Sequence, residues 1–319
     1  MKKVLLTTSA LVAFAGFAAA EVTFGGEATV GYNDVEEGGI YTDGSLDITG
    51  SAEFDGGVSL SVTYGLDLYT GDFDAFPTIT VTTQWATLTV GDVEYAAVDM
   101  FADVDGMDGV SGFREIDDEV VARVDLTLGG FALGVATDAN EDYNNADQLS
   151  IGLSGELGAF SMTAGYDMVN EVMGVSLGGA FGGFDVDVAY MTDETGADSI
   201  GLGLGATMGG VGLTGYYAIN SNAADAYGVG ASFTSGAMTL GAYWDGDDAG
   251  ASNFGVTADY VVNDAITVGA GYDEADSFYV YGTMMVGAAE VGASYNDDGD
   301  GDMDDDYKAG ITVWITMPF

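Results

Sequence analysis

The sequence has no cysteine and no histidine, and among its 319 residues only five are Lys or Arg, against 52 Asp and Glu. Without cysteine, a disulfide framework and a thiolate metal site are excluded. Without histidine, the usual general base and the commonest transition-metal ligand are missing, and no carboxylate pair stands out to replace them. We therefore expect that the protein is not an enzyme. The strongly negative net charge also argues against nucleic acid as a partner, because neutralising its phosphates depends on Lys and Arg.

Long apolar runs are absent after residue 20, although 48% of the residues are hydrophobic. No run there approaches the ~18 residues that a membrane-spanning helix requires. The first twenty residues instead have the form of a secretory signal: Lys2 and Lys3, the apolar stretch VLLTTSALVAFAGFA, and three alanines before Glu21. A membrane anchor would need a longer apolar part. We predict that residues 1–20 are a signal peptide for the Sec pathway and that residues 21–319 form a single exported domain.

Within residues 21–319 the prevailing pattern is alternation of apolar with small or polar residues. The stretch VSLSVTYGLDLY at 58–69 places its apolar side chains on one face of a strand and its polar ones on the other. Counting such stretches of roughly 7–13 residues gives about twenty strands. A soluble sandwich could bury the apolar face against a second sheet. Together with the export signal and the acidic second face, the pattern favours an all-β transmembrane, antiparallel up-and-down β-barrel with an even strand number, lipid outside and water inside.

Two kinds of connection alternate along the chain. Tight, glycine-rich turns such as Gly129-Gly130 and Gly182-Gly183 alternate with longer acidic stretches such as DANEDYNNAD at 138–147. Short turns at one rim and longer loops at the other are typical of an outer-membrane barrel, and both termini then belong at the tight-turn rim. Aromatic residues follow the same division: Phe131, Phe160, Phe184 and Phe233 lie beside tight turns, whereas Tyr64, Tyr166, Tyr190, Tyr217, Tyr227, Trp244 and Tyr272 lie toward the acidic loops. Such rings are expected at the two membrane interfaces.

One connection is much longer than the others and covers residues 93–118. It contains Met100, Phe101, Val104, Met107, Val110 and Phe113 and is too apolar for an external loop surrounded by water. Loops of this length are usually functional or disordered. We expect that it folds inward and packs against the barrel wall.

Three segments carry a family resemblance: EVTFGGEATVGY at the start of the exported domain, ITVTTQWATLTVGD before the long connection, and the last strand AGITVWITMPF. Through them the chain resembles the general diffusion porins of Gram-negative bacteria, in particular the alphaproteobacterial Rhodobacter-type porins. The final Phe319 is similar to the C-terminal signature that the barrel-assembly machinery reads. The resemblance implies a homotrimer of sixteen-stranded, water-filled barrels in the outer membrane, each narrowed by its third external loop, here 93–118. Family porins oppose this loop with a cluster of wall arginines, whereas this chain has only Arg114 and Arg123 to offer.

The acids define a candidate pore constriction. In EVVARVDLTL the apolar residues face lipid, so Arg123 and Asp125 face the lumen. With the residues of the long connection, the candidate constriction comprises Glu94, Asp99, Asp103, Asp105, Asp108, Arg114, Glu115, Asp117, Asp118, Arg123 and Asp125. Carboxylates around a passage concentrate cations and repel anions, so we expect passive diffusion of small hydrophilic solutes with a preference for cations. The pattern leaves open whether Arg123 is a pore-wall charge or a structural partner that pins the loop carboxylates.

A weak metal motif lies in the acidic stretch at 296–306. Asn296, Asp298 and Asp300 have the spacing that begins a calcium loop, but the twelfth position is Tyr307, where an EF-hand needs a bidentate Glu. No cofactor is required by the predicted function, and Ca²⁺ bound here, bridging to lipopolysaccharide, is a secondary hypothesis beside a simple solvated loop.

Two other functions compete with diffusion. A secreted calcium-binding β-solenoid would require tandem G-G-x-G-x-D nonapeptides, and the sequence has none. A non-conducting structural or adhesive outer-membrane barrel is compatible with the same pattern, and a conductance measurement separates it from a pore.

Overall fold

A computed structural model describes residues 20–36, 38–71, 76–108, 110–115, 119–139, 148–273, 277–297 and 307–319. Within these ranges, no helix has both the length and the apolar character needed to cross a bilayer. The described elements are twenty strands and one short helix, α1. They are β1 Glu21–Asn33, β2 Ile40–Phe54, β3 Val58–Asp67, β4 Thr78–Thr82, β5 Ala86–Gly91, α1 Ala96–Met100, β6 Val121–Leu128, β7 Phe131–Asp138, β8 Ser150–Leu157, β9 Phe160–Asp167, β10 Val172–Phe181, β11 Phe184–Thr192, β12 Asp198–Met208, β13 Val211–Asn220, β14 Ala226–Ser235, β15 Met238–Asp247, β16 Ser252–Asn263, β17 Ile266–Asp273, β18 Phe278–Val286, β19 Ala289–Asn296 and β20 Gly310–Pro318.

Every strand pairs antiparallel with its neighbours in the chain, and β20 pairs with β1 to close the sheet. The prediction of about twenty strands is confirmed, and the sixteen strands implied by the resemblance are wrong for this chain. The two counts differ because each alternating stretch forms a strand of its own, including the short β4 and β5 and the late β19. Closure pairs the strands along both edges, so the sheet leaves no open edge to be buried in hydrocarbon.

The turns follow the predicted division between the two rims. Tight turns join β6 to β7 and β10 to β11, where Gly129, Gly182 and Gly183 have φ of 69°, 60° and 93°. Such positive φ values are strained for residues with a Cβ, which explains glycine at these positions. The first part of β1 and the end of β20 lie together at this rim, where Gly26 and Phe319 exchange backbone hydrogen bonds of 3.2 and 2.9 Å.

The register keeps the two faces of the sheet separate all the way around the barrel. Asp187 pairs with Gly203, which pairs with Tyr216 on the inner face, while Val188 pairs with Leu202 on the outer face. Following such pairs through the described strands, the only charged residue on the outer face is Asp198, the first residue of β12. Asp125 faces inward, as predicted, and Asp185 and Asp187 face inward as well. The outer surface is therefore suited to hydrocarbon and the inner one to water.

Aromatic side chains form contacts near both edges of the outer face. Phe160 and Phe181 lie beside the tight turns with ring centroids 5.6 Å apart. Tyr227 and Trp244 lie toward the longer loops, with centroids 5.5 Å apart. This arrangement agrees with the predicted interfacial rings.

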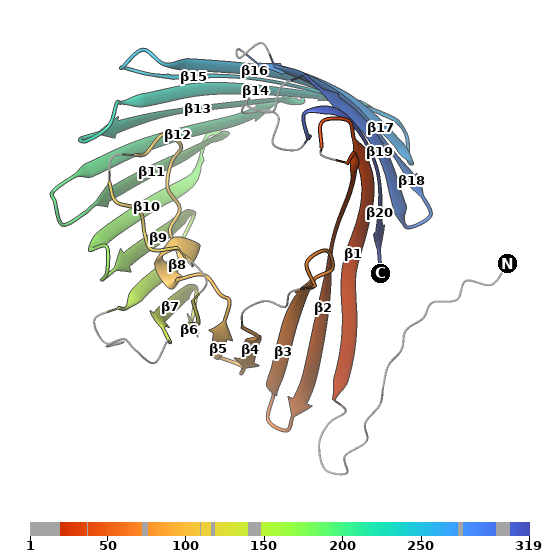
Figure 1. The fold of residues 1–319 in the computed structure, drawn as a ribbon. Helices are drawn as coiled ribbons and strands as arrows, with labels where there is room; N and C mark the ends of the chain where they lie inside the picture. Colours follow the sequence, from red (N-terminus) through yellow and green to blue (C-terminus); the bar gives the residue numbers. More distant parts are fainter. Residues whose placement is uncertain are drawn as a thin grey trace.

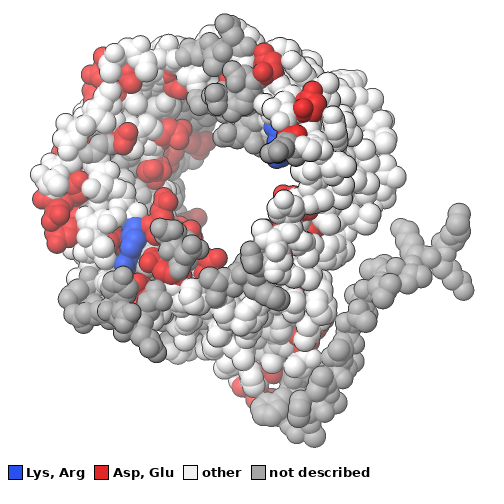
Figure 2. Space-filling model, viewed as in Figure 1, with Lys and Arg blue, Asp and Glu red and all other residues white. Residues whose placement is uncertain are grey.

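Figure 1 shows the strands as a ring around an open centre, with the long connection, in gold, running along the inner side of β7–β12. The space-filling view shows the same central opening, with acidic side chains gathered on the wall that carries this connection (Figure 2). The long connection therefore folds inward, as predicted, and follows the wall instead of closing the passage.

The outer face generates the first prediction. Leu202 lies mid-strand on that face, so Leu202→Arg should lower the unfolding free energy in lipid vesicles by about 2–4 kcal/mol, the cost of a cation at the bilayer midplane. The control is Thr214→Arg, which places the same side chain on the inner face opposite two glycines. Urea titration followed by tryptophan fluorescence measures both, and equal losses would contradict the assignment of the faces.

Candidate pore constriction

The long connection is held against the wall by its helix α1. Ala96 and Ala97 of this helix are fully buried, and α1 packs on β7, β8 and β9. The alternation pattern did not predict this helix, because five residues are too few to show a helical period. The alternation pattern resumes at Glu119, directly after the long connection, whereas strand β6 begins at Val121.

A row of glycines gives α1 its place on the wall. Gly134, Gly152, Gly165 and Gly174 are directly paired across β7, β8, β9 and β10, all on the inner face. A Cβ on Gly134 would lie 2.8 Å from Met100, and one on Gly165 would lie 2.8 Å from Phe113. A Cβ on Gly152 would collide with the Ala96 carbonyl. The row is a groove in the wall that only glycine leaves deep enough for the long connection.

Apolar side chains fill the space between the long connection and the wall. One cluster joins Tyr95 and Ala96 to Val121 and Ala136, and a second joins Ala97 and Phe113 to Val172 and Met191. Phe101 meets Phe113 edge-on with ring centroids 5.4 Å apart. A barrel with a wet centre has little other core, so these clusters are the main buried apolar contacts that position the long connection.

Wall side chains also satisfy backbone groups of the long connection. Ser150 Oγ accepts a hydrogen bond from Ala97 N at 2.9 Å, and Thr163 Oγ1 accepts one from Ala102 N at 3.0 Å. Farther along, Asn220 Oδ1 accepts from Asp108 N at 2.9 Å while its Nδ2 donates to Gly106 O at 2.9 Å. These bonds span β8 to β13, so the connection is anchored along its length.

The carboxylate of Asp193, just beyond β11, holds the return of the connection. It accepts a hydrogen bond from Ser111 N at 3.1 Å. Hydrogen bonds from the Thr195 side chain and from the Ser111 amide lower the pKa of Asp193. Because its pKa is lowered, this anchor holds at neutral pH and is lost only as pH falls through the lowered value.

Arg123 joins the wall to α1. Its Nε donates to Asp125 Oδ1 at 2.9 Å on the same strand, and its Nη2 donates to Asp99 Oδ2 at 2.5 Å in the helix. Its Nη1 donates to the Glu94 carbonyl at 3.2 Å, and only 6% of the residue is exposed. Of the two roles left open by the sequence, this geometry is that of a structural partner that pins the loop carboxylates.

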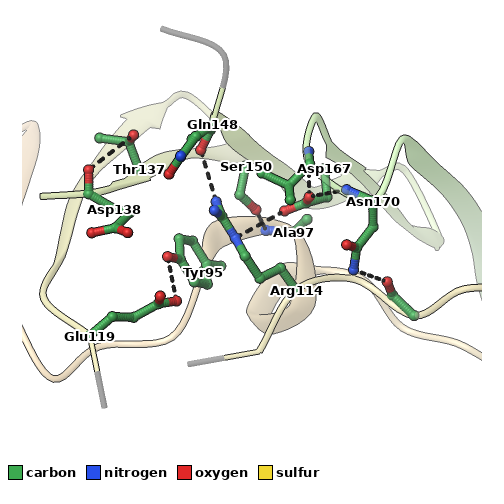
Figure 3. Close-up of polar contacts among 12 residues, drawn as sticks. Tyr95, Ala97, Arg114, Glu119, Thr137, Asp138, Gln148, Ser150, Asp167 and Asn170 are labelled. Atoms are coloured by element: carbon green, nitrogen blue, oxygen red, sulfur yellow. Dashed lines mark hydrogen bonds and ion pairs between the residues drawn. The ribbon is translucent and has the colours of Figure 1, made fainter. Parts of the chain in front are cut away.

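Arg114 makes a second attachment (Figure 3). Its Nη2 donates to the Gln148 carbonyl at 2.8 Å, and its Nε lies 3.8 Å from Asp167 Oδ2, a buried carboxylate. Its guanidinium also lies 3.8 Å from the centre of the Tyr95 ring, a cation–π contact. Burial, and then a hydrogen bond donated to Glu119, raise the pKa of Tyr95, which stays a neutral donor.

Lys308 is the third cation of the described residues, and it forms an ion pair of 2.7 Å with Glu36. All three cations of the described ranges are therefore paired with acids. The lumen keeps a large excess of carboxylates with no opposing base.

Part of that excess gathers in one cavity of about 430 Å³ between the tip of the long connection and β11–β15. It is lined by five acids: Asp103, Asp105, Asp185, Asp187 and Asp245. Of the other predicted constriction residues, Glu94, Asp99, Asp108 and Glu115 are exposed, and Asp117 and Asp118 lie outside the described residues. The structure thus places Asp103 and Asp105 together, and adds wall acids that were not on the predicted constriction list.

The predicted calcium motif falls largely outside the described residues, which include neither Asp298 nor Asp300. Asn296 is fully buried at the end of β19, and its Nδ2 donates to the Tyr307 carbonyl at 2.8 Å. Within the described part of the chain, no group of three or more acidic side chains forms a metal-ion site.

The profile of a family described as Gram-negative porin matches residues 7–277. The chain belongs to the Gram-negative porins. Among solved structures, a triple mutant of the Rhodopseudomonas blastica porin is 14% identical, with 93% of this chain and all of that chain covered and a TM-score of 0.47. OmpT of Vibrio cholerae is 12% identical, with 97% and 100% covered and a TM-score of 0.43. Among curated proteins, no sequence matches this chain significantly.

Sequence reasoning missed two parts of the candidate constriction. The glycine row was hidden because its members lie one to a strand and meet only through the register. Ser150 and Asn220 were missed because single polar residues at strand ends carry no pattern. The glycines at 134, 152, 165 and 174 all stand at inward positions, and that phase is the one signal that could have revealed the row.

Arg123→Ala should loosen the constriction of this porin. It leaves Asp99 and Asp125 without their shared cation, and because Asp99 is half exposed, we expect a local loss of about 1–2 kcal/mol. Hydrogen exchange at residues 96–101 should then speed up about tenfold. Arg123→Lys keeps the charge but not the forked geometry of the guanidinium. Its exchange rate should therefore lie between those of the native protein and of the alanine variant. Unchanged exchange in the alanine variant would remove Arg123 from the anchoring role.

Gly152→Val should displace α1, because the new side chain occupies the position of the Ala96 carbonyl. We expect faster hydrogen exchange in α1 and a smaller single-channel conductance, since a detached connection enters the passage. The matched control is Gly205→Val on the inner face of β12, where a Cβ meets only Asp185 at 3.5 Å or more. Equal behaviour of the two variants would show that the glycine row does not seat the connection.

Proposed function

We propose that this porin forms a passive, water-filled pore for small hydrophilic solutes and ions and that it prefers cations. The observation that carries the proposal is the imbalance of fixed charge. Arg114, Arg123 and Lys308 are each held in an ion pair, while Asp103, Asp105, Asp185, Asp187 and Asp245 line one lumen cavity together. Such a wall attracts cations and repels anions without coordinating either tightly.

The proposed mechanism needs no moving part and no chemistry. Solutes cross the central opening of the ring (Figure 2), and the anchored connection borders this opening on one side only. Weak, repeated attraction by separate carboxylates permits both entry and exit of cations. The proposal gives the chain no catalytic role.

Several further features belong to the same proposal. We propose export through the Sec pathway after removal of residues 1–20, insertion by the barrel-assembly machinery through Phe319, and a homotrimer in contact with outer-membrane lipid and lipopolysaccharide. Family membership and the neutral outer face support the membrane location. Calcium at Asn296, Asp298 and Asp300 stays a secondary hypothesis, and a flat calorimetric titration with Ca²⁺ would end it.

Planar bilayers with a KCl gradient test the main proposal. The reversal potential should have the sign of cation permeation, and Asp185→Asn with Asp187→Asn should lower the cation-to-anion permeability ratio about twofold. Asp198→Asn is the matched control, because it removes a carboxylate from the outer face. An anion-selective reversal potential would refute the cation preference. Correctly folded protein that does not conduct would favour the alternative, a structural or adhesive barrel.

A further inference from the structure

A second lumen cavity lies on the wall across the ring from the anchored connection. It has a volume of about 490 Å³ and is lined by residues of β1, β2 and β18–β20 and of the segment just before β20. Its aromatic lining is Tyr41, Tyr307 and Trp314, and its acids are Asp43 and Glu290. Neither the predicted constriction nor the proposed ion preference uses this cavity.

The aromatic rings of this cavity are fixed in position. Tyr307 stacks on Tyr281 with centroids 5.0 Å apart and a 20° angle between the rings, and its carbonyl accepts the bond from Asn296. Trp314 lies over Gly292 of the neighbouring strand, where a Cβ would collide with the indole. Its Nε1 donates to Glu290 Oε1 at 3.2 Å. Rings held in this way can bind a ligand without a further loss of conformational entropy.

A buried hydroxyl in the same cavity has no partner. Ser294 is 6% exposed and lines the cavity, and its Oγ makes no hydrogen bond. Leaving such a group unsatisfied costs about 1–3 kcal/mol, so buried hydroxyls are normally paired. The missing partner points to a donor or acceptor supplied by a bound molecule.

The charge of the cavity determines the class of that molecule. Lys308 lines the cavity, but its ammonium is paired with Glu36 and lies 4.8 Å from the centre of the Tyr41 ring. Among the described residues, neither Asp43 nor Glu290 belongs to an ion pair. Aromatic faces beside unneutralised carboxylates attract cations that carry some apolar surface.

We propose that this cavity is a binding subsite for a small organic ammonium ion. Its ammonium group pairs with Glu290 and its apolar body lies against Trp314 and Tyr307, while Asp43 adds negative charge elsewhere in the cavity and Ser294 Oγ offers a further polar contact. A neutral sugar would leave both carboxylates without a counter-charge, and a bare metal ion would make no use of the aromatic faces. The proposal requires a water-filled lumen but not ion conduction, so it can be tested apart from the proposed function.

The test uses Trp314 as its own reporter. Trp85→Phe with Trp244→Phe removes the other two tryptophans, which lie in a tight turn and on the outer face. In this background, refolded in detergent at low salt, benzylammonium should change the Trp314 fluorescence saturably. Neutral benzyl alcohol should need at least about tenfold higher concentration, and glucose should give no change.

Glu290→Gln keeps an acceptor for the Trp314 indole while removing the charge, and it should raise the apparent Kd for benzylammonium about fivefold. Glu53→Gln, on the inner face beside the tight turn that joins β2 to β3 and not among the residues that line the cavity, should leave the Kd unchanged. An equal response to benzyl alcohol, a response to glucose alone, or an unchanged Kd in Glu290→Gln would overturn the proposal. Variants are compared only where circular dichroism shows the native barrel. Saturable binding to a barrel that does not conduct would reject the pore and keep the subsite.

Discussion

The structure depends on one constraint: every strand needs a hydrogen-bonded neighbour on both sides, because hydrocarbon offers the backbone no other partner. The pairing of β20 with β1 meets this constraint and joins the two ends of the chain at one rim. Closure also fixes the phase of all strands together, since residues paired across strands face the same way. An exterior with Asp198 as the one charged residue of its described strands and an acidic interior both follow from that single phase.

The inner face then divides into two working surfaces. On one side, the glycine row, two apolar clusters and two arginines hold the long connection. On the other, aromatic rings lie over glycines and border a cavity with two acids that form no ion pair with any described residue. Glycine serves the same purpose on both surfaces, because the missing side chain leaves space on the wall. The long connection fills this space on one side, and aromatic rings such as Trp314 fill it on the other. The scarcity of cations matters here, because all three in the described ranges serve attachment and none is left to oppose the acids.

Much of the fold could be predicted because strand alternation is a local signal. The strand number, the inward face of Asp125, the two kinds of turn and the inward course of the long connection all followed from residues close in sequence. The family's sixteen strands were a poorer guide than the count of alternating stretches. What could not be predicted depends on register between distant strands. Gly134 and Gly174 both lie under the long connection only because three successive pairings align them, and Arg123 reaches Asp99 only after the connection has turned back.

The long connection is anchored tightly in its first part and loosely at its tip. Substitutions are therefore tolerated better at the tip than in the first part. Its first part, residues 95–101, packs so closely on the wall glycines that larger side chains would collide there. Its tip carries exposed Asp103 and Asp105 at the border of open solvent. Insertions at the tip would thus change the width and the charge of the central opening and leave the barrel wall and residues 95–101 as they are. The barrel wall and residues 95–101 are thus a fixed scaffold, whereas the tip of the long connection can vary. Sequence differences among related chains should therefore concentrate at the tip.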